Sequence, residues 1–249
     1  MIGINLFRSL PDASSLSHTF SDDDEGDVFS DPEWPHISLV YELLIHLVLS
    51  AQIDNNIRKR LIDDNFLRNL ISLFDSYDQR ERDYLKTVTH RIYGKLTNRR
   101  VTIRKAINYV FYQFLYEKKE HNGIAELLEI LASIINGFTI PIRPEHRQSL
   151  ERSLIPLHKT RYYDQYSIQL SYCMTLYVAK DPSLSEPVRG FFPLTFPSHI
   201  SLPLTFPSIS HLDHSCFTQV LALWINGEGD VVLVRAGRLV GVNQAGRHC

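Results

Sequence analysis

The stretch that decides the fold runs from Asp78 to His146. It begins with DQRERDYLKTVTHRIYGKLTNRR (78–100) and ends with HNGIAELLEILASIINGFTIPIRPEH (121–146). At about 100° per residue, the apolar residues of 84–96 fall on one face of a helix and most polar residues on the other. The inward residues are Leu85, Val88, Ile92 and Leu96, with Tyr84 at their edge; the outward ones are Lys86, Thr87, His90, Arg91 and Tyr93. The stretch predicts two successive helical hairpins with one basic, partly apolar groove.

The outward face of this helix has the chemistry of a binding surface. Cations, a histidine, a hydroxyl and a phenol can hold a carboxylate or phosphate while an aromatic ring packs on an apolar group. An ordinary solvated basic face has the same composition. In the following apolar helix, Ile130 and Ile134 lie at the edge of the core stripe. They are either flank packing or the floor of a small pocket.

Further helical patterns surround this stretch on both sides. Apolar residues recur at helical spacing in the segments 34–48, 57–62, 66–74, 100–118, 123–138, 145–157 and 166–179. Asp64 or Asn65, Asp78 and Asn122 are expected to cap helices. Helical pairs recur about every 40 residues, the spacing of HEAT-like repeats. The expected fold is therefore an all-α, HEAT-like α-solenoid of about four helical hairpins.

Composition divides the chain into three expected regions. Residues 1–31 are expected to form a disordered acidic arm, since residues 21–33 hold seven acids and no base. Residues 78–119 carry eleven Lys or Arg against four acids, so the arm could shield the basic groove. Residues 32–188 form the helical repeat domain. Residues 189–249 form an atypical tail, with the repeat PLTFPSHIS/PLTFPSIS and strand-like segments around Asn226-Gly227. The tail is either a foreign end or a small β-module outside the solenoid.

The motif search favours a non-catalytic protein. The sequence has no Gly-rich phosphate loop, His-Glu-x-x-His, Cys-x-x-Cys or Gly-x-Ser-x-Gly motif, so we expect no catalytic residues, no cofactor and no metal site. Three scattered cysteines fit a reducing compartment. The longest apolar helix, 36–51, is too short to span a bilayer. A cytoplasmic or nuclear protein that binds no membrane is the expectation.

Several long segments resemble the B-prime regulatory subunits of protein phosphatase 2A. They are WPHISLVYELLIHLV (34–48), LFDSYDQRERDYLKTVTHRIYGK (73–95), EKKEHNGIAELLEILASIINGF (117–138), IPLHKTRYY (155–163) and LSEPV (184–188). The resemblance covers residues 31–188. It implies a HEAT-like regulator in signal transduction that joins a phosphatase scaffold subunit and a catalytic subunit. It also implies that substrates are chosen through acidic motifs of the type Leu-x-x-Ile-x-Glu.

The resemblance assigns roles to individual positions. His90 and Arg91 match the residues that hold the acidic side chain of the motif. Tyr93, Ile130 and Ile134 match the residues that surround the aliphatic side chains of the motif, and Thr87 and Arg100 lie nearby. Arg143, which stands where the family usually has Lys, and His146 are expected to serve further acids or phosphates.

The resemblance also leaves alternatives open. Family members have about eight repeats and this chain holds about four, so it could be a decoy that binds motifs without assembling a holoenzyme. It could also be a fragment without a stable fold. A nucleic-acid-binding repeat would use Lys86, Arg91, Lys95, Arg99, Arg100, Arg104 and Lys105. These cations lie on different helix faces with few aromatic residues between them, so no nucleic-acid partner is expected.

Overall fold

The structure is a computed structural model, and it describes residues 2–10, 29–118, 120–189, 223–225, 231–235 and 238–241. The chain divides into two compact units, Met1–Val188 and Arg189–Cys249. In the first unit all described elements are helical, which confirms the all-α prediction. The helices are α1 (Ile2–Leu6), α3 (Trp34–Leu49), α4 (Asn55–Leu61), α5 (Asp64–Ser72), α6 (Gln79–Lys95), α7 (Arg100–Tyr116), α8 (Ile124–Asn136), α9 (Pro144–Ser149), α10 (Ile155–Leu157), α11 (Ser167–Lys180) and α12 (Ser185–Arg189).

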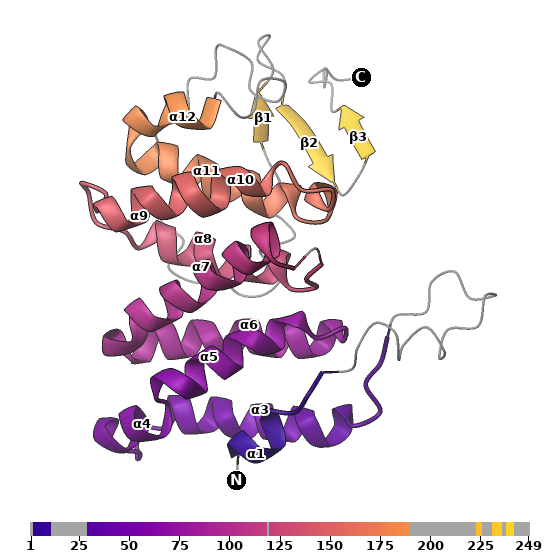
Figure 1. The fold of residues 1–249 in the computed structure, drawn as a ribbon, viewed down its shortest axis with the longest axis vertical. Helices are drawn as coiled ribbons and strands as arrows, with labels where there is room; N and C mark the ends of the chain where they lie inside the picture. Colours follow the sequence, from indigo (N-terminus) through magenta and orange to yellow (C-terminus); the bar gives the residue numbers. More distant parts are fainter. Residues whose placement is uncertain are drawn as a thin grey trace, which may run out of the picture. The chain divides into compact units, whose positions relative to one another are not determined.

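The helices of the first unit pack in two layers. One layer is the series α3, α6, α8 and α11, in which each helix contacts the next (Figure 1). The other is formed by α5, by α7, and by the helical segment that runs from α9 to α10. The hairpins α5–α6, α7–α8 and α9/α10–α11 therefore each contribute one helix to each layer. This stacking of successive hairpins is the arrangement of a HEAT-like solenoid.

Helix α6 has the inward face that the sequence predicts. Leu85, Val88 and Ile92 are fully buried, and Leu96 is nearly so. Removing each of these side chains from water contributes about 1.5–3 kcal/mol. The helix begins where predicted, because the Asp78 side chain accepts a hydrogen bond from the backbone N–H of Arg80. Helix α6 packs on α3 on one side and on α8 on the other, so it is an inner helix of its layer.

Two other predicted caps are wrong. Helix α5 is capped by Asp63, whose side chain accepts from the Phe66 N–H at 2.7 Å, and not by Asp64 or Asn65. Asn122 does not cap α8, which begins after Gly123. The backbone N–H of Asn122 instead donates to Asp75 Oδ1 at 3.0 Å, and Asn122 Nδ2 donates to Asp75 O at 2.9 Å. These bonds fix the loop before α8 to the end of the preceding hairpin.

The N-terminal residues differ from the predicted disordered arm. Residues 2–10 and 29–31 pack on the helical unit, and Leu6 is fully buried. Arg8 makes two hydrogen bonds to Glu81 of α6, at 2.8 and 2.9 Å, and pairs with Asp31 at 2.7 Å. A buried carboxylate requires such partners, so Glu81 draws the N-terminal segment onto α6. The remainder of the predicted arm, residues 11–28, lies outside the described residues.

The region before α11 is helical but irregular. The predicted helix 145–157 consists of α9, a π-helical stretch Leu150–Leu154, and α10. In the second unit, the strands β1 (Leu223–Ile225), β2 (Val231–Arg235) and β3 (Arg238–Gly241) form an antiparallel sheet in the order β1-β2-β3. The predicted Asn226-Gly227 turn lies outside the described residues. None of the described helices combines the length and apolar character needed to cross a bilayer.

Candidate functional site

The end of α6 and the start of α7 bring together two of the predicted residues. Arg100 Nε donates to the backbone oxygen of Tyr93 at 3.0 Å. Its guanidinium carbon lies 5.2 Å from the centre of the Tyr93 ring, which is the geometry of a cation–π contact. Arg104, one helical turn further along α7, donates from Nη1 to Tyr93 Oη at 3.2 Å. The Tyr93 ring is therefore held between α6 and α7 by two arginines.

A second group of contacts joins α7 to α9. Arg104 Nη2 lies 3.3 Å from Glu145 Oε1, and the same oxygen lies 3.6 Å from His146 Nε2. The imidazole stacks on Phe138 with 3.8 Å between ring centres and 8° between planes. Tyr177 of α11 donates to the backbone oxygen of His146 at 3.2 Å. Tyr93, Arg100 and His146 thus belong to one continuous series of contacts that passes through Arg104 and Glu145.

The electrostatics of this series favour a neutral His146. Burial of the imidazole lowers its pKa below the ordinary value, and the charges of Arg104 and Arg143 lower it further. Glu145 acts in the opposite direction but does not reverse the shift. At neutral pH the uncharged ring can therefore form a hydrogen bond to a ligand's carboxylate, but it does not form an ion pair with it. A negative ligand beside it would favour protonation.

Three predicted residues lie on the solvent side of α6. His90 and Arg91 are exposed, and Thr87 is half-buried, with its hydroxyl donating to the backbone oxygen of Asp83 at 3.1 Å. Within the described part of the chain, Arg91 has no ion-pair partner. Arg143 is also exposed and occupies the N-cap position of α9, three residues before His146. Arg91 and Arg143 can therefore meet a ligand's charge.

The two predicted isoleucines are placed differently. Ile130 and Ile134 of α8 are 2% and 3% exposed. A ligand can reach only a small part of either side chain in this conformation. For an aliphatic anchor to settle on them, neighbouring side chains have to move. The structure therefore places seven of the nine predicted residues on α6, the start of α7 and the start of α9, while these two belong to the core face of α8.

Sequence reasoning missed three residues of this region. Arg104, Glu145 and Phe138 connect the predicted residues to one another. Arg104 had a detectable signal, because it follows Arg100 by four residues and so lies on the same side of α7. The stacking of Phe138 on His146 had none, since Phe138 continues the apolar period of the predicted helix 123–138 equally well as a core residue.

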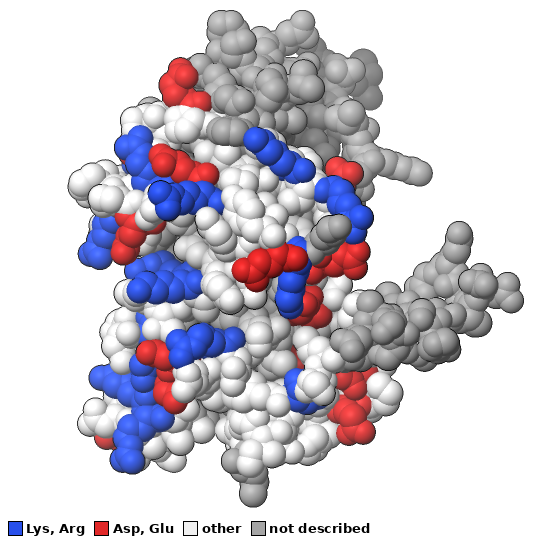
Figure 2. All heavy atoms as spheres, in the orientation of Figure 1, with Lys and Arg blue, Asp and Glu red and all other residues white. Residues whose placement is uncertain are grey.

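Several cations of the basic surface are already paired. Lys86 lies 2.6 Å from Glu129 of α8, and Arg99 lies 2.8 Å from Asp64 of α5. Burial alone would lower the pKa of Lys86, but Glu129 raises it above its ordinary value. Figure 2 shows Lys and Arg side chains along the left-hand side of the helical unit, from the level of α4 to that of α9, with acidic side chains among them. This mixed surface gives little support to the nucleic-acid alternative.

Known proteins similar to this chain are phosphatase regulators. The model of the family described as protein phosphatase 2A regulatory B subunit (B56 family) matches residues 1–199. The B' beta isoform of the 57 kDa regulatory subunit of serine/threonine protein phosphatase 2A from Arabidopsis thaliana is 51% identical over 201 residues, which are 78% of this chain and 40% of that protein. The delta isoform of the 56 kDa regulatory subunit from Homo sapiens is 48% identical over 188 residues, which are 76% of this chain and 31% of that protein.

The match to the family model extends through the whole helical unit. The chain spans about two-fifths of the length of the Arabidopsis relative and a smaller share of the human one. Both relatives are named as regulatory subunits, in agreement with the expectation of a regulator. Because the family model covers well over half of the chain, this protein belongs to the B56 family of protein phosphatase 2A regulatory B subunits.

Proposed function

We propose that this chain binds short acidic motifs of the type Leu-x-x-Ile-x-Glu and thereby specifies substrates for protein phosphatase 2A. One observation carries the proposal: the continuous series of contacts from Tyr93 to His146, flanked by the exposed Arg91 and Arg143. It offers aromatic surface and cations together on adjacent helical hairpins. An acidic peptide with aliphatic anchors needs both.

The proposed roles follow from this placement. Arg91 and His90 would bind the carboxylate of the motif by charge-assisted hydrogen bonds, each contributing roughly 1.5–3 kcal/mol. An aliphatic anchor beside Tyr93 would contribute about 1.5–3 kcal/mol once neighbouring side chains move and uncover Ile130 and Ile134. After the cost of ordering the peptide, an affinity in the micromolar range is expected. Additional acids or phosphates beside the motif would interact with Arg143 and, less directly, with Arg100 and His146.

Peptide titration tests the site. A fluorescent acidic Leu-x-x-Ile-x-Glu peptide is expected to bind the full chain, and Arg91→Glu is expected to weaken this binding at least about tenfold by reversing a charge that faces the ligand. Fluorescence anisotropy gives both affinities. Arg68→Glu, an equal charge reversal on the exposed side of α5, serves as the control and should leave binding unchanged. Equal affinities for wild type and the Arg91 variant would refute the site.

The partners are part of the same proposal. We propose that the chain joins the scaffold and catalytic subunits of the phosphatase in the cytoplasm or nucleus. Co-purification of the full chain with both subunits tests assembly independently of the motif peptide. Peptide binding without co-purification would mean that the chain binds motifs but does not recruit a phosphatase.

A further inference from the structure

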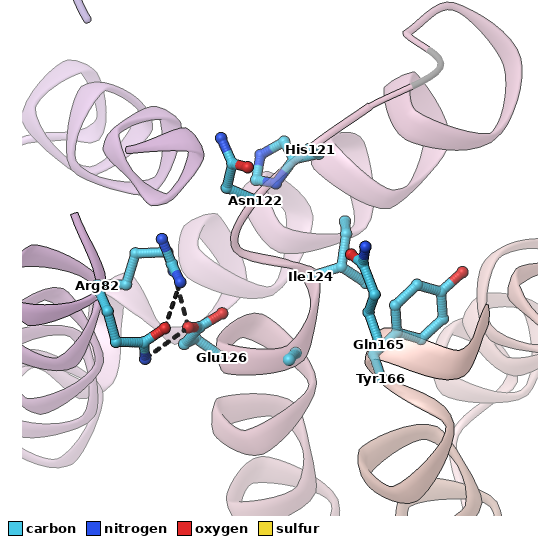
Figure 3. Close-up of a pocket in the computed structure, with 9 residues that line it drawn as sticks. Arg82, His121, Asn122, Ile124, Glu126, Gln165 and Tyr166 are labelled. Carbon is cyan, nitrogen blue, oxygen red and sulfur yellow. Dashed lines mark hydrogen bonds and ion pairs between the residues drawn. The ribbon is translucent and has the colours of Figure 1, made fainter. Parts of the chain in front are cut away.

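A pocket of about 200 Å³ lies away from the candidate peptide site. It is formed by the start of α6, by the loop before α8 and the first turn of α8, and by the residues before α11 (Figure 3). Its lining consists of Gln79, Arg82, His121, Asn122, Ile124, Ala125, Glu126, Gln165 and Tyr166. Gln79 and Tyr93 stand at opposite ends of α6, about 20 Å apart along its axis. The pocket is therefore distant from the Tyr93 end of the site proposed above, and none of the residues assigned to that site lines it.

Arg82 and Glu126 form a buried ion pair at the wall of the pocket. Arg82 Nε donates to Glu126 Oε1 at 2.8 Å, and Gln79 Nε2 donates to the same oxygen at 3.1 Å. Arg82 Nη1 also donates to the backbone oxygens of Ser76 and Tyr77, at 2.7 and 3.2 Å. The guanidinium is thus bound to several protein acceptors at once, and Oε1 of the carboxylate is satisfied twice.

The other oxygen of this carboxylate has no partner among the described residues. Glu126 is 5% exposed, and its Oε2 atom is buried without a hydrogen bond. In Figure 3 one Glu126 oxygen lies toward Arg82 and the other points away from it. A buried carboxylate oxygen without a donor is unfavourable and rare in folded proteins. Glu126 therefore holds a buried acceptor without a donor at the wall of the pocket, and an external donor reaches it when neighbouring side chains move.

The neighbouring groups restrict what this donor can be. His121 Nδ1 accepts the Gly123 N–H at 3.1 Å, and burial lowers the pKa of the ring, so the imidazole is neutral. Tyr166 directs its hydroxyl proton to the backbone oxygen of Leu157 at 2.9 Å. A phosphate or carboxylate would place its oxygens against Glu126 Oε2, which repels them. A cationic donor instead forms a charge-assisted hydrogen bond, about twice as strong as a neutral one.

We propose that this pocket binds a primary ammonium group, such as the end of a lysine side chain from a partner protein. A compact ammonium suits a single free oxygen better than the wide fork of a guanidinium does. Ile124 and Ala125 provide apolar surface for the methylene stem beside that oxygen. The inference goes beyond motif binding and does not depend on it.

Titration with a lysine derivative tests the proposal on the full chain. Saturation-transfer NMR with Nα-acetyl-lysine amide is expected to show binding. The Nε-acetylated and norleucine analogues, which lack the ammonium group, should bind at least about tenfold more weakly. Failure of the lysine derivative to bind, or equal binding of norleucine, would overturn the proposal and leave water as the occupant of the pocket.

Variants locate the binding. Glu126→Gln removes the charge and should reduce affinity for the lysine derivative about tenfold or more. Ala125→Phe fills the pocket while leaving Arg82 and Glu126 in place, and it should abolish binding even if Glu126→Gln does not fold. Glu129→Gln is the control, because Glu129 lies one turn later on α8, pairs with Lys86 and does not line the pocket. Wild-type affinity in a folded Ala125→Phe variant would contradict the assignment.

Discussion

At the scale of single residues, buried charges explain contacts that join distant segments. Glu81 is fully buried in α6 and accepts hydrogen bonds from Arg8 and from Tyr41 Oη, the latter at 2.9 Å. Burial and the charge of Glu81 both raise the pKa of Tyr41, so its hydroxyl remains a donor. A carboxylate in this position stabilises the fold only while its partners are present.

Replacement of Arg8 tests this dependence. Arg8→Met leaves Glu81 buried with Tyr41 as its remaining partner and should lower the free energy of unfolding by about 3 kcal/mol. Urea denaturation followed by circular dichroism measures the change. Arg68→Met removes an exposed arginine whose bond among the described residues is to Asn65 in its own helix, and it should change stability little. Equal effects of the two substitutions would mean that the contacts of Arg8 with Glu81 and Asp31 contribute nothing to stability.

Buried histidines predict a dependence of stability on pH. Burial lowers the pKa of His121 below the ordinary value, although Asp75 acts in the opposite direction, and the pKa of His146 is lowered too. Unfolded histidines titrate near about 6.5. Below that pH the unfolded state binds more protons than the folded state. The stability due to these neutral rings is therefore fully present above about pH 6.5 and is lost as the pH falls through their folded-state pKa values.

The measurement compares urea denaturation at neutral and at mildly acidic pH. The free energy of unfolding of wild type should be lower at the acidic pH, by at most about 1.4 kcal/mol per pH unit for each histidine. His121→Asn keeps an oxygen acceptor for the Gly123 N–H and removes one titrating group, so its pH dependence should be shallower. An identical pH dependence in this variant would exclude His121 as a source of the effect.

At the scale of elements, the start of α8 depends on close approach between two loops. Gly123 lies against the 3₁₀ turn Leu73–Asp75, and a Cβ atom added to Gly123 would lie 2.2 Å from Phe74 O. The same loop is held by the hydrogen bonds from Asn122 to Asp75. No local helix signal requires a glycine here, since its φ is −105°. The requirement is steric and comes from the neighbouring hairpin.

Paired glycine substitutions test this requirement. Gly123→Ala should destabilise the protein by at least about 1–3 kcal/mol through overpacking. Gly94→Ala, inside α6 where an added Cβ meets nothing within 4 Å, should stabilise it by about 0.5–1 kcal/mol. Thermal denaturation measures both. Opposite signs are expected, and a neutral Gly123→Ala would show that the loop before α8 can move away from Phe74.

At the scale of the molecule, the helical unit is built from contacts between successive hairpins. Helix α8 illustrates this, because it packs on α6 on one side and on α11 on the other. The Cys173 thiol of α11 donates to the backbone oxygen of Leu128 in α8 at 3.3 Å, and its burial raises the pKa of this thiol strongly. Stability of such a stack is approximately a sum of neighbouring interfaces.

This architecture predicts that the helical unit folds without the second unit. A chain that ends at Val188 should keep its helical circular dichroism and unfold cooperatively, with a midpoint within a few degrees of the full chain, because Met1–Val188 is a compact unit by itself. Thermal denaturation followed by the helical circular dichroism signal compares the two chains. A broad, non-cooperative transition of the shorter chain would show that residues 189–249 contribute to the fold.

The sequence by itself determined the helices and their faces. The apolar period of 84–96 placed Leu85, Val88 and Ile92 in the core, and Asp78 marked the start of α6. These features depend on residues three or four positions apart, which are adjacent on a helix in any context. The segments around them also carry the likeness to the B56 family, which depends on sequence alone.

Only the tertiary structure decided which polar groups meet. The partners Arg8 and Glu81 are separated by 73 residues, Lys86 and Glu129 by 43, and Arg82 and Glu126 by 44. Periodicity places Lys86 on the outward face of its helix and Glu126 in the first turn of the next apolar helix. It cannot show that α8 brings Glu129 to Lys86 and Glu126 to Arg82. The same packing buries Ile130 and Ile134 and stacks Phe138 on His146. The physical reason is that a helix pattern records which face is apolar, whereas the identity of the neighbour depends on how whole hairpins stack.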